Sequence, residues 1–192
     1  MKRILIINGH PDKKSFNFSI AEAYKNGAIQ AGAQVQEIVI ADLQFNPDLE
    51  FGYRRRTEIE SDLEEAWQKI IWAEHLVWVH PVWWGGLPAK MKGFIDRIFL
   101  PGHAFRYRAN SIFWDKLLKD KTARIITTLD QPSWYYWLFY GKPSVNQLKK
   151  STLEFCGIQP VKVTYFGIVK TSNEKTRTKW LKKAEALGVH GK

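Results

Sequence analysis

The sequence has almost no cysteine and no long apolar run. Its single cysteine among 192 residues, Cys156, excludes an intramolecular disulfide, and the surrounding run LEFCG favours a place in the core. No apolar stretch approaches the roughly 20 residues of a membrane span. The apolar run after the basic start MKR is too short for a secretory signal. We therefore expect a cytoplasmic protein without an integral membrane segment.

Several motifs that carry known chemistry are also missing. The chain has neither GxGxxG nor GxxxxGK[ST], so a classical dinucleotide Rossmann site and a P-loop are not supported. It has no GxSxG nucleophile elbow. Its five histidines show no metal-ligand spacing, and we expect no metal site. Any phosphate must be held by a loop rich in hydroxyl and amide groups.

Positive charge, in contrast, is in excess. Lys and Arg number 29 against 19 Asp and Glu, which gives a net charge of +10. Such a balance raises nucleic acid as a partner, but the charge is scattered and no helix-turn-helix or RNA-binding motif is present. We therefore expect no nucleic-acid partner. Basic residues could instead attract a phosphorylated cofactor.

Short apolar runs alternate with helical patterns along the whole chain. The pattern predicts an α/β single domain over 1–192, with parallel crossovers and a doubly wound three-layer sheet. The segment 101–121 looks like a surface excursion. Strands are expected at 3–9, 34–43, 75–81, 123–129 and 159–169, and helices at 15–32, 60–75, from about 88, 144–157 and 173–188.

The helix at 60–75 has the clearest amphipathic pattern. Ser61 is a plausible cap, and acidic residues fill the first turns. The expected inner face consists of Leu63, Ala66, Trp67, Ile70 and Ile71.

In doubly wound folds, ligands bind beyond the carboxyl ends of the strands. GHPDKKSFN follows the first strand and places Ser15, Asn17 and free amides at a helix start, which suits a phosphate but is also explained by simple capping. PVWWGGLPAKMKGFIDRIF follows the third strand. Its glycines allow a close ligand approach and its indoles offer flat faces, although core or interface packing is an alternative.

The third such segment, TTLDQPSWYYWLFYGKP, begins with Thr127 and Thr128 at the end of a strand and continues into an aromatic cluster. The cluster is open to three interpretations: a membrane-surface patch, a subunit interface or a lid on a pocket.

With these three segments in hand, the chain resembles the flavodoxin-like NAD(P)H:quinone oxidoreductases, the group of DT-diaphorase and modulator of drug activity B. GHPDKKSFN resembles that family's first flavin loop, PVWWGGLPAKMKGFIDRIF its second, and ITT its third, in the same order from residue 1 to about 185. The resemblance implies a flavodoxin-like sandwich with a five-stranded parallel sheet in the order 2-1-3-4-5. It implies FAD, with FMN as the alternative, and NAD(P)H as co-substrate.

Cofactor contacts follow from matching these motifs residue by residue. The first loop would hold the phosphate and ribityl chain, the second the isoalloxazine edge and the third its other side. Arg177 stands where the family places an arginine on the adenosine of FAD. The implied contacts are His10, Lys14, Ser15, Phe16 and Asn17 in the first loop, Pro81, Val82, Trp83, Trp84 and Gly85 in the second, and Thr127, Thr128 and Leu129 in the third.

The implied activity is a ping-pong reduction of quinones by two electrons, with azo or nitro compounds as possible acceptors. Tyr135 matches a family tyrosine beside the flavin, and Trp84, Trp134 and Tyr136 could sandwich flat substrates. The family is usually a homodimer. Some relatives instead regulate potassium efflux systems by binding them, and that accessory role is the alternative.

One departure from the family bears on the flavin. Vertebrate quinone reductases have Gly-Gly after the Thr-Thr pair, where this chain has Leu129 and Asp130. A carboxylate at that edge would oppose the negative charge that reduction creates, unless it points away.

Overall fold

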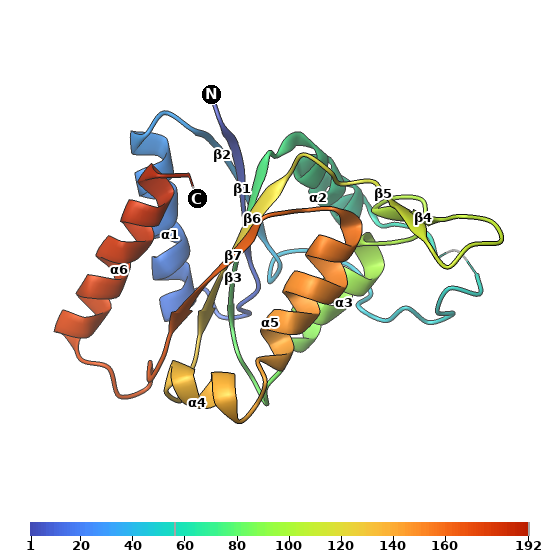
Figure 1. Ribbon diagram of the computed structural model, residues 1–192. Helices are drawn as coiled ribbons and strands as arrows, with labels where there is room; N and C mark the ends of the chain where they lie inside the picture. Colours follow the sequence, from blue (N-terminus) through green and yellow to red (C-terminus); the bar gives the residue numbers. More distant parts are fainter. Residues whose placement is uncertain (56, 192) are drawn as a thin grey trace.

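A five-stranded parallel sheet runs through the middle of the molecule (Figure 1). The computed structural model describes residues 1–55 and 57–191. The strands lie in the order β2-β1-β3-β6-β7, which confirms the predicted 2-1-3-4-5 topology. They are β1 (Arg3–Asn8), β2 (Gln34–Val39), β3 (His75–Pro81), β6 (Thr122–Thr128) and β7 (Val161–Phe166).

Helices cover both faces of this sheet and form two separate cores (Figure 1). One face carries α1 (Phe16–Gln30) and α6 (Glu174–Val189). The other carries α2 (Ser61–Trp72), α3 (Ala89–Ile98) and α5 (Pro143–Leu148). Strand β3 is buried along its whole length because apolar side chains on both of its faces pack under helices.

Two glycines fix how α1 and α6 pack. A Cβ on Gly27 would lie 2.0 Å from the carbonyl oxygen of Glu185, and one on Gly188 would lie 2.1 Å from that of Tyr24. Only glycine permits so close an approach of the two backbones. The same packing brings the starts of both helices together, so that the guanidinium of Arg177 lies 5.5 Å from the ring centre of Phe16.

The helix α2 differs from its prediction in two residues. Its N-cap is Glu60 rather than Ser61, which is the first helical residue. Ile71 is 45% exposed and is not part of the inner face. Because each helical residue turns the chain by about 100°, Ile71 rotates away from the core that Ile70 enters, and Trp72 packs partly against that core instead.

Three further features were not predicted. The excursion at 101–121 contains an antiparallel hairpin of β4 (Phe105–Tyr107) and β5 (Trp114–Lys116). The aromatic cluster contains the short helix α4 (Ser133–Leu138). The single helix expected at 144–157 is α5 followed by a π-helical turn at Lys149–Glu154. Cys156 is buried as expected, and burial raises the pKa of its thiol to about 12.

Candidate functional site

The loop after β1 is built from hydrogen bonds within itself. The amide of His10 donates to the side-chain oxygen of Asn8, the amide of Asp12 to Nδ1 of His10, and the amide of Lys14 to a carboxylate oxygen of Asp12, all at 2.9–3.0 Å. The contacts to Asn8 and Asp12 are Asx-type turns, which bend the chain sharply without secondary structure. These hydrogen bonds therefore fix the path of the backbone from β1 to the start of α1.

The start of α1 presents hydrogen-bond donors without partners among the described residues. Ser15 is the N-cap, but its side chain makes no capping bond, and its Oγ is buried without a partner among the described residues. The amides of Phe16 and Asn17 likewise donate to nothing in the described part of the chain. Free N–H groups at the positive end of a helix, beside an unpartnered hydroxyl, are the donors that a phosphate takes.

The second loop is a tight turn at the end of β3. Trp83 and Gly86 exchange backbone hydrogen bonds of 3.1 and 2.8 Å, while Trp84 and Gly85 have φ values of 51° and 77°. Positive φ at both central residues is the geometry of a type I′ turn, and it is uncommon for tryptophan. In the structure's described residues, nothing accepts from the amides of Trp84 and Gly85, so two N–H groups remain available.

The third loop follows β6. Thr128 is buried and its Oγ1 lies 3.1 Å from the side-chain nitrogen of Asn17, whereas the buried Oγ1 of Thr127 has no partner in the described chain. Leu129 is buried, and Asp130 accepts the amide of Lys170 at 3.1 Å. The carboxylate of Asp130 therefore caps the loop after β7.

The three loops contact one another at the carboxyl edge of the sheet. The rings of His10 and Trp83 meet edge to face with centroids 5.5 Å apart. Asn17 is bonded to Thr128, and the amide of Val82 donates to the carbonyl of Thr128 at 2.9 Å. Pro81 lies at the end of β3 in register with Thr128. The structure thus brings the three predicted segments into one surface.

Arg177 lies beside this surface. Its Nε donates to Oγ of Ser172 at 2.9 Å and its Nη2 to the carbonyl of Val169 at 3.3 Å. These bonds, with the contact to Phe16, hold the guanidinium next to the start of α1. A cation at this position adds to the attraction for an anion bound there.

Helix α4 separates the predicted aromatic residues into two groups. Trp134 is 60% exposed, and Tyr135 is partly exposed and stacks on Phe139 with centroids 4.8 Å apart. Tyr136 has no exposed surface, and its hydroxyl lies 2.7 Å from Oγ of Ser144. A side chain so enclosed cannot stack on a substrate. The predicted substrate contact of Tyr136 therefore does not agree with the structure, in which this side chain lies beneath the turn.

Two histidines near the site have lowered pKa values. Burial lowers the pKa of His10, although the Asp12 backbone and carboxylate act in the opposite direction. Burial also lowers the pKa of His80, to about 4. The Nδ1 of His80 is 3.0 Å from the carbonyl of Pro81, which fixes the proton on that nitrogen because a carbonyl only accepts. Lys14 is exposed and is the cation nearest in sequence to Ser15.

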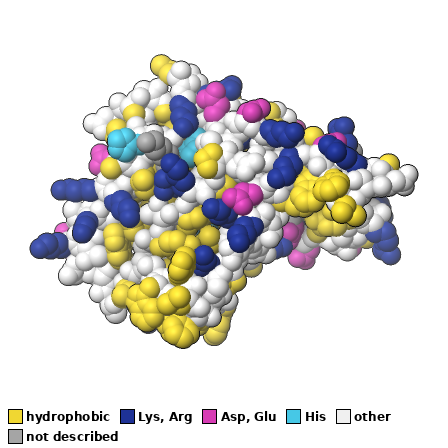
Figure 2. Space-filling model, in the orientation of Figure 1, with side chains coloured by type: hydrophobic (Ala, Val, Ile, Leu, Met, Phe, Trp, Pro, Cys, Tyr) yellow, Lys and Arg dark blue, Asp and Glu magenta, His cyan; other side chains and the backbone are white. Residues whose placement is uncertain are grey.

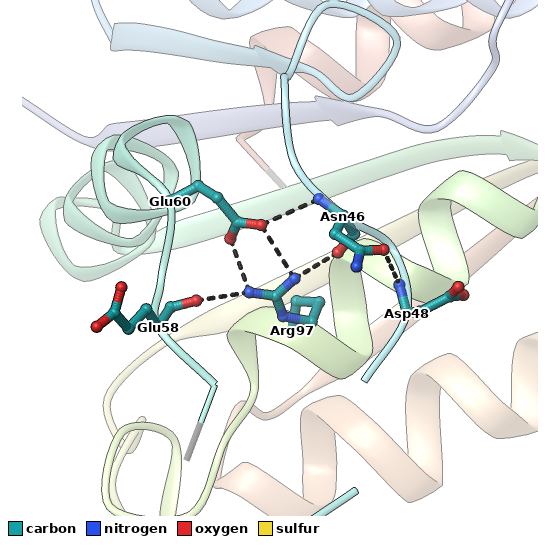
Figure 3. A network of polar contacts seen from close by, with 5 residues as sticks. All are labelled: Asn46, Asp48, Glu58, Glu60 and Arg97. Carbon is teal, nitrogen blue, oxygen red and sulfur yellow. Dashed lines mark hydrogen bonds and ion pairs between the residues drawn. The ribbon is translucent and has the colours of Figure 1, made fainter. Parts of the chain in front are cut away.

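The later part of the PVWWGGLPAKMKGFIDRIF segment is structural. Arg97 is 1% exposed and its guanidinium contacts the Glu60 carboxylate at 2.7 and 3.1 Å and the carbonyls of Glu58 and Asn46 (Figure 3). A Cβ on Gly93 would lie 2.4 Å from the ring of Pro47. These residues tie α3 to the connection before α2.

Two residues that belong to the site were missed. Asn8 ends β1, and its side-chain nitrogen is buried with no partner among the described residues. The sequence could have indicated Asn8, because it is a polar residue at the carboxyl end of an apolar strand. Ser144 carried no such signal, because its contacts to Tyr136 and to the turn come from tertiary packing alone.

The donor set fits a phosphorylated flavin. Buried polar groups are normally hydrogen-bonded, so unpartnered atoms at one edge of the sheet indicate a ligand. Across the described ranges, no group of three or more His, Cys, Asp or Glu could hold a metal, and no helix is long and apolar enough to cross a membrane. The unpartnered groups at this edge include Asn8 Nδ2, Ser15 Oγ, His80 Nε2, Thr127 Oγ1 and the amides of Phe16, Asn17, Trp84 and Gly85.

Comparison with known proteins places the fold in a family. Residues 2–187 match the family described as having a flavodoxin-like fold, and the chain belongs to that family. It is 29% identical over 178 residues to an uncharacterized NAD(P)H oxidoreductase of Haemophilus influenzae, covering 90% of this chain and 87% of that protein. It is 27% identical over 184 residues to NAD(P)H dehydrogenase [quinone] 1 of Cavia porcellus, covering 83% of this chain and 66% of that enzyme.

A solved structure extends the comparison to three dimensions. The crystal structure of Smu.1420 from Streptococcus mutans UA159 superposes with a TM-score of 0.83 at 29% identity, covering 98% of this chain and 99% of that one. The likeness in fold therefore extends over almost the whole chain.

Proposed function

We propose that this chain is a single flavin-binding domain that transfers electrons from NAD(P)H to quinones or similar acceptors. The observation that carries the proposal is the meeting of three loops whose unpartnered donors surround one edge of the sheet. The family and the NAD(P)H oxidoreductases among its relatives support the same conclusion. A cytoplasmic location is part of the proposal.

The cofactor's phosphate is assigned to the start of α1. Ser15 Oγ and the amides of Phe16 and Asn17 donate to it, and the exposed Lys14 and half-buried His10 stand beside it. The free amides of Trp84 and Gly85 donate to the isoalloxazine edge, while Thr127 faces its other side. The remaining contacts of the two later loops are assigned to Pro81, Val82, Trp83, Thr128 and Leu129.

A bound flavin supplies the redox chemistry, because it accepts a hydride from a nicotinamide and passes two electrons to a second substrate. The chain's own residues position the reactants. Trp84 is fully exposed and Trp134 mostly so, which leaves flat faces for a planar substrate. Asp130 is engaged by the loop after β7, so its charge is turned from the cofactor's edge. Tyr135 is assigned a hydrogen bond to the reactants.

FAD is favoured over FMN by the place of Arg177. Its guanidinium lies over Phe16, next to the phosphate position, where only the adenosine part of FAD would extend. A larger loss of FAD affinity than of FMN affinity in Arg177→Ala, measured by titration of the apoprotein, tests this assignment. Equal affinities of the variant and the wild type for FAD would overturn it.

A homodimer is proposed from two apolar areas on one side of the molecule. Figure 2 shows hydrophobic side chains gathered over α4 and over the β4–β5 hairpin. The first includes Trp137, Leu138 and Phe139, exposed by 54–69%, and the second Ile112 and Phe113, exposed by 88% and 63%. Two areas of this kind can pair reciprocally in a two-fold dimer, which would also cover the exposed substrate face. Sedimentation equilibrium measures the mass directly.

The experiment that tests the redox function is an anaerobic visible spectrum of the purified protein, with NADPH and then a benzoquinone added. We expect a flavin spectrum that bleaches and then returns. A flavin that binds but stays oxidised would favour the accessory role. Absence of flavin, even after reconstitution with FAD or FMN, would overturn the proposal and leave the tryptophans as packing residues.

A further inference from the structure

The turn between Trp83 and Gly86 is held from behind by two buried residues. The carbonyl of Gly85 accepts the amide of Ser144 at 3.0 Å and the hydroxyl of Tyr136 at 3.4 Å. The two side chains are also bonded to each other, since Tyr136 Oη lies 2.7 Å from Ser144 Oγ and 3.1 Å from the Ser144 amide. Tyr136 is 0% and Ser144 is 1% exposed.

The turn needs such an anchor because its own contacts are few. Trp84 is in the left-handed region, which is unfavourable for a residue other than glycine. Its indole is fully exposed and therefore gains no packing energy in return. Apart from the two bonds that close the turn, the chain is held at one end by the bond from Val82 to Thr128 and at the other by the Gly85 carbonyl.

We propose that Tyr136 and Ser144 are a positioning pair that holds the Gly85 carbonyl inward, so that the amides of Trp84 and Gly85 point outward to the flavin. The inference rests on the proposed flavin function. The reason is the rigidity of the peptide group, in which a carbonyl fixes the direction of the next residue's amide. The Gly85 carbonyl thus fixes the amide of Gly86, which donates to the Trp83 carbonyl at 2.8 Å, and the Trp83 carbonyl fixes the amide of Trp84. The Gly85 amide belongs to the one peptide group between these two fixed groups. Neither residue touches the cofactor; both act through the turn.

The hydrogen bonds of Tyr136 and Ser144 lie in apolar surroundings, so their loss cannot be made good by water. Tyr136 packs with Leu129 and Val145 in a small apolar cluster. A polar group that loses its partner in such a place has no water to replace it. Burial raises the pKa of the Tyr136 phenol, although the Ser144 bonds act against that shift, so the hydroxyl keeps its proton and remains a donor.

The test uses Tyr136→Phe and Ser144→Ala, with Tyr165→Phe as the matched control. Tyr165 packs against the same cluster, with its ring centre 6.5 Å from that of Tyr136, and its hydroxyl makes no bond to the turn. Three quantities are measured: the flavin dissociation constant by fluorescence titration of the apoprotein, the midpoint potential of bound flavin, and the amide signals of Trp84 and Gly85 in the NMR spectrum of the apoprotein.

We expect Tyr136→Phe and Ser144→Ala each to weaken flavin binding about tenfold, the effect of one buried hydrogen bond. They should also shift the midpoint potential and the two amide signals, whereas Tyr165→Phe leaves all three unchanged. Ser144→Ala keeps the backbone amide and removes one oxygen, so it preserves the test if Tyr136→Phe fails to fold.

The outcomes separate this inference from the proposed function. A wild-type protein that takes up no flavin overturns the proposed function, and the amide signals of the variants then still decide whether the pair anchors the turn. A wild-type protein that binds flavin, with both variants equal to it in affinity and potential, overturns the positioning pair alone. Equal effects of all three substitutions would indicate general loosening of the cluster and would also overturn it.

Discussion

The side-chain amide of Asn17 donates to the hydroxyl of Thr128 at 3.1 Å, across 111 residues of sequence. Both side chains are buried. The bond joins the first turn of α1 to the carboxyl end of β6 and so fixes the distance between the phosphate position and the third loop.

Substitution of Asn17 by Ala should therefore affect both stability and ligand binding. The Thr128 hydroxyl would lose its donor in a buried place, and we expect the free energy of unfolding to fall by about 1–2 kcal/mol. Flavin affinity should fall with it, because the helix start is no longer tied to the third loop. Urea unfolding and flavin titration measure the two effects. Ser19→Ala, at an exposed position of the same helix, is the control. An Asn17→Ala protein as stable as this control would contradict the role of the bond.

The sequence was sufficient to predict the sheet but not all of its surroundings. Strands such as β3 are continuous apolar runs between turn residues, so their number and order followed from pattern and resemblance. The β4–β5 hairpin was missed because strands of three residues are too short to show a period. Helix α4 was missed because its run SWYYWL is aromatic on every side and has no polar face.

Prediction of the site had a similar limit. Residues on the three loops could be named because a parallel sheet must gather its carboxyl ends at one edge. Which side chain of a tyrosine pair points outward could not be read from sequence. Tyr135 and Tyr136 are neighbours, and only the packing of α4 against Ser144 and Val145 turns the second one inward. The interaction of Arg97 with Glu60 is equally a product of tertiary structure.

The Arg97–Glu60 pair should control acid stability. Burial by itself raises the pKa of Glu60, but hydrogen bonds from the Asn46 amide and from Arg97 outweigh burial and lower that pKa. A carboxyl group with a lowered folded pKa stabilises the fold above its unfolded value, near pH 4.5, and the contribution is lost as the pH falls through the folded value.

Glu60→Gln should accordingly be less stable than the wild type at pH 7, by on the order of 2 kcal/mol, and should lose less of its stability between pH 5 and pH 3. Urea midpoints across this range give the comparison. Glu185→Gln removes one exposed acidic charge that makes no ion pair in the structure's described part, and it serves as the control. Parallel pH curves for the wild type and Glu60→Gln would show that Glu60 is not the titrating group.

His80 should give a second, separate pH dependence at milder acidity. Burial lowers its folded pKa to about 4, while the unfolded value is about 6.5. Between these values the unfolded chain binds more protons, so this contribution to stability is complete above pH 6.5 and falls as the pH drops toward 4, by up to about 1.4 kcal/mol per pH unit.

His80→Leu should reduce that slope, and His190→Gln, at an exposed histidine, should leave it unchanged. His75, whose pKa burial lowers to about 3, contributes a slope of the same sign in every variant, so the difference between variants isolates His80. The measurement is urea unfolding at several values between pH 7.5 and pH 4.5. If His80→Leu retains the full wild-type slope, His80 has the same pKa in the folded and unfolded protein, and burial does not keep it neutral.

Trp84 combines an unfavourable backbone with an unburied side chain, which is the pattern of a residue kept for ligand contact. Its φ of 51° is strained, and its indole gains nothing from packing in the free protein. Asparagine accepts the left-handed region readily. Trp84→Asn should therefore be as stable as the wild type or more stable, by about 1 kcal/mol, while the KM for a benzoquinone rises about twofold to tenfold through loss of stacking.

Ile168 provides the matched control for the expected gain in stability and rise in KM of Trp84→Asn. It also has a positive φ, 63°, and a partly exposed side chain, but it lies after β7 and outside the three loops. Ile168→Asn should gain similar stability with no change in KM. Thermal unfolding and steady-state kinetics on both variants separate strain from stacking. A Trp84→Asn protein that is strongly destabilised would mean that the indole supports the fold, and an unchanged KM would remove it from the acceptor site.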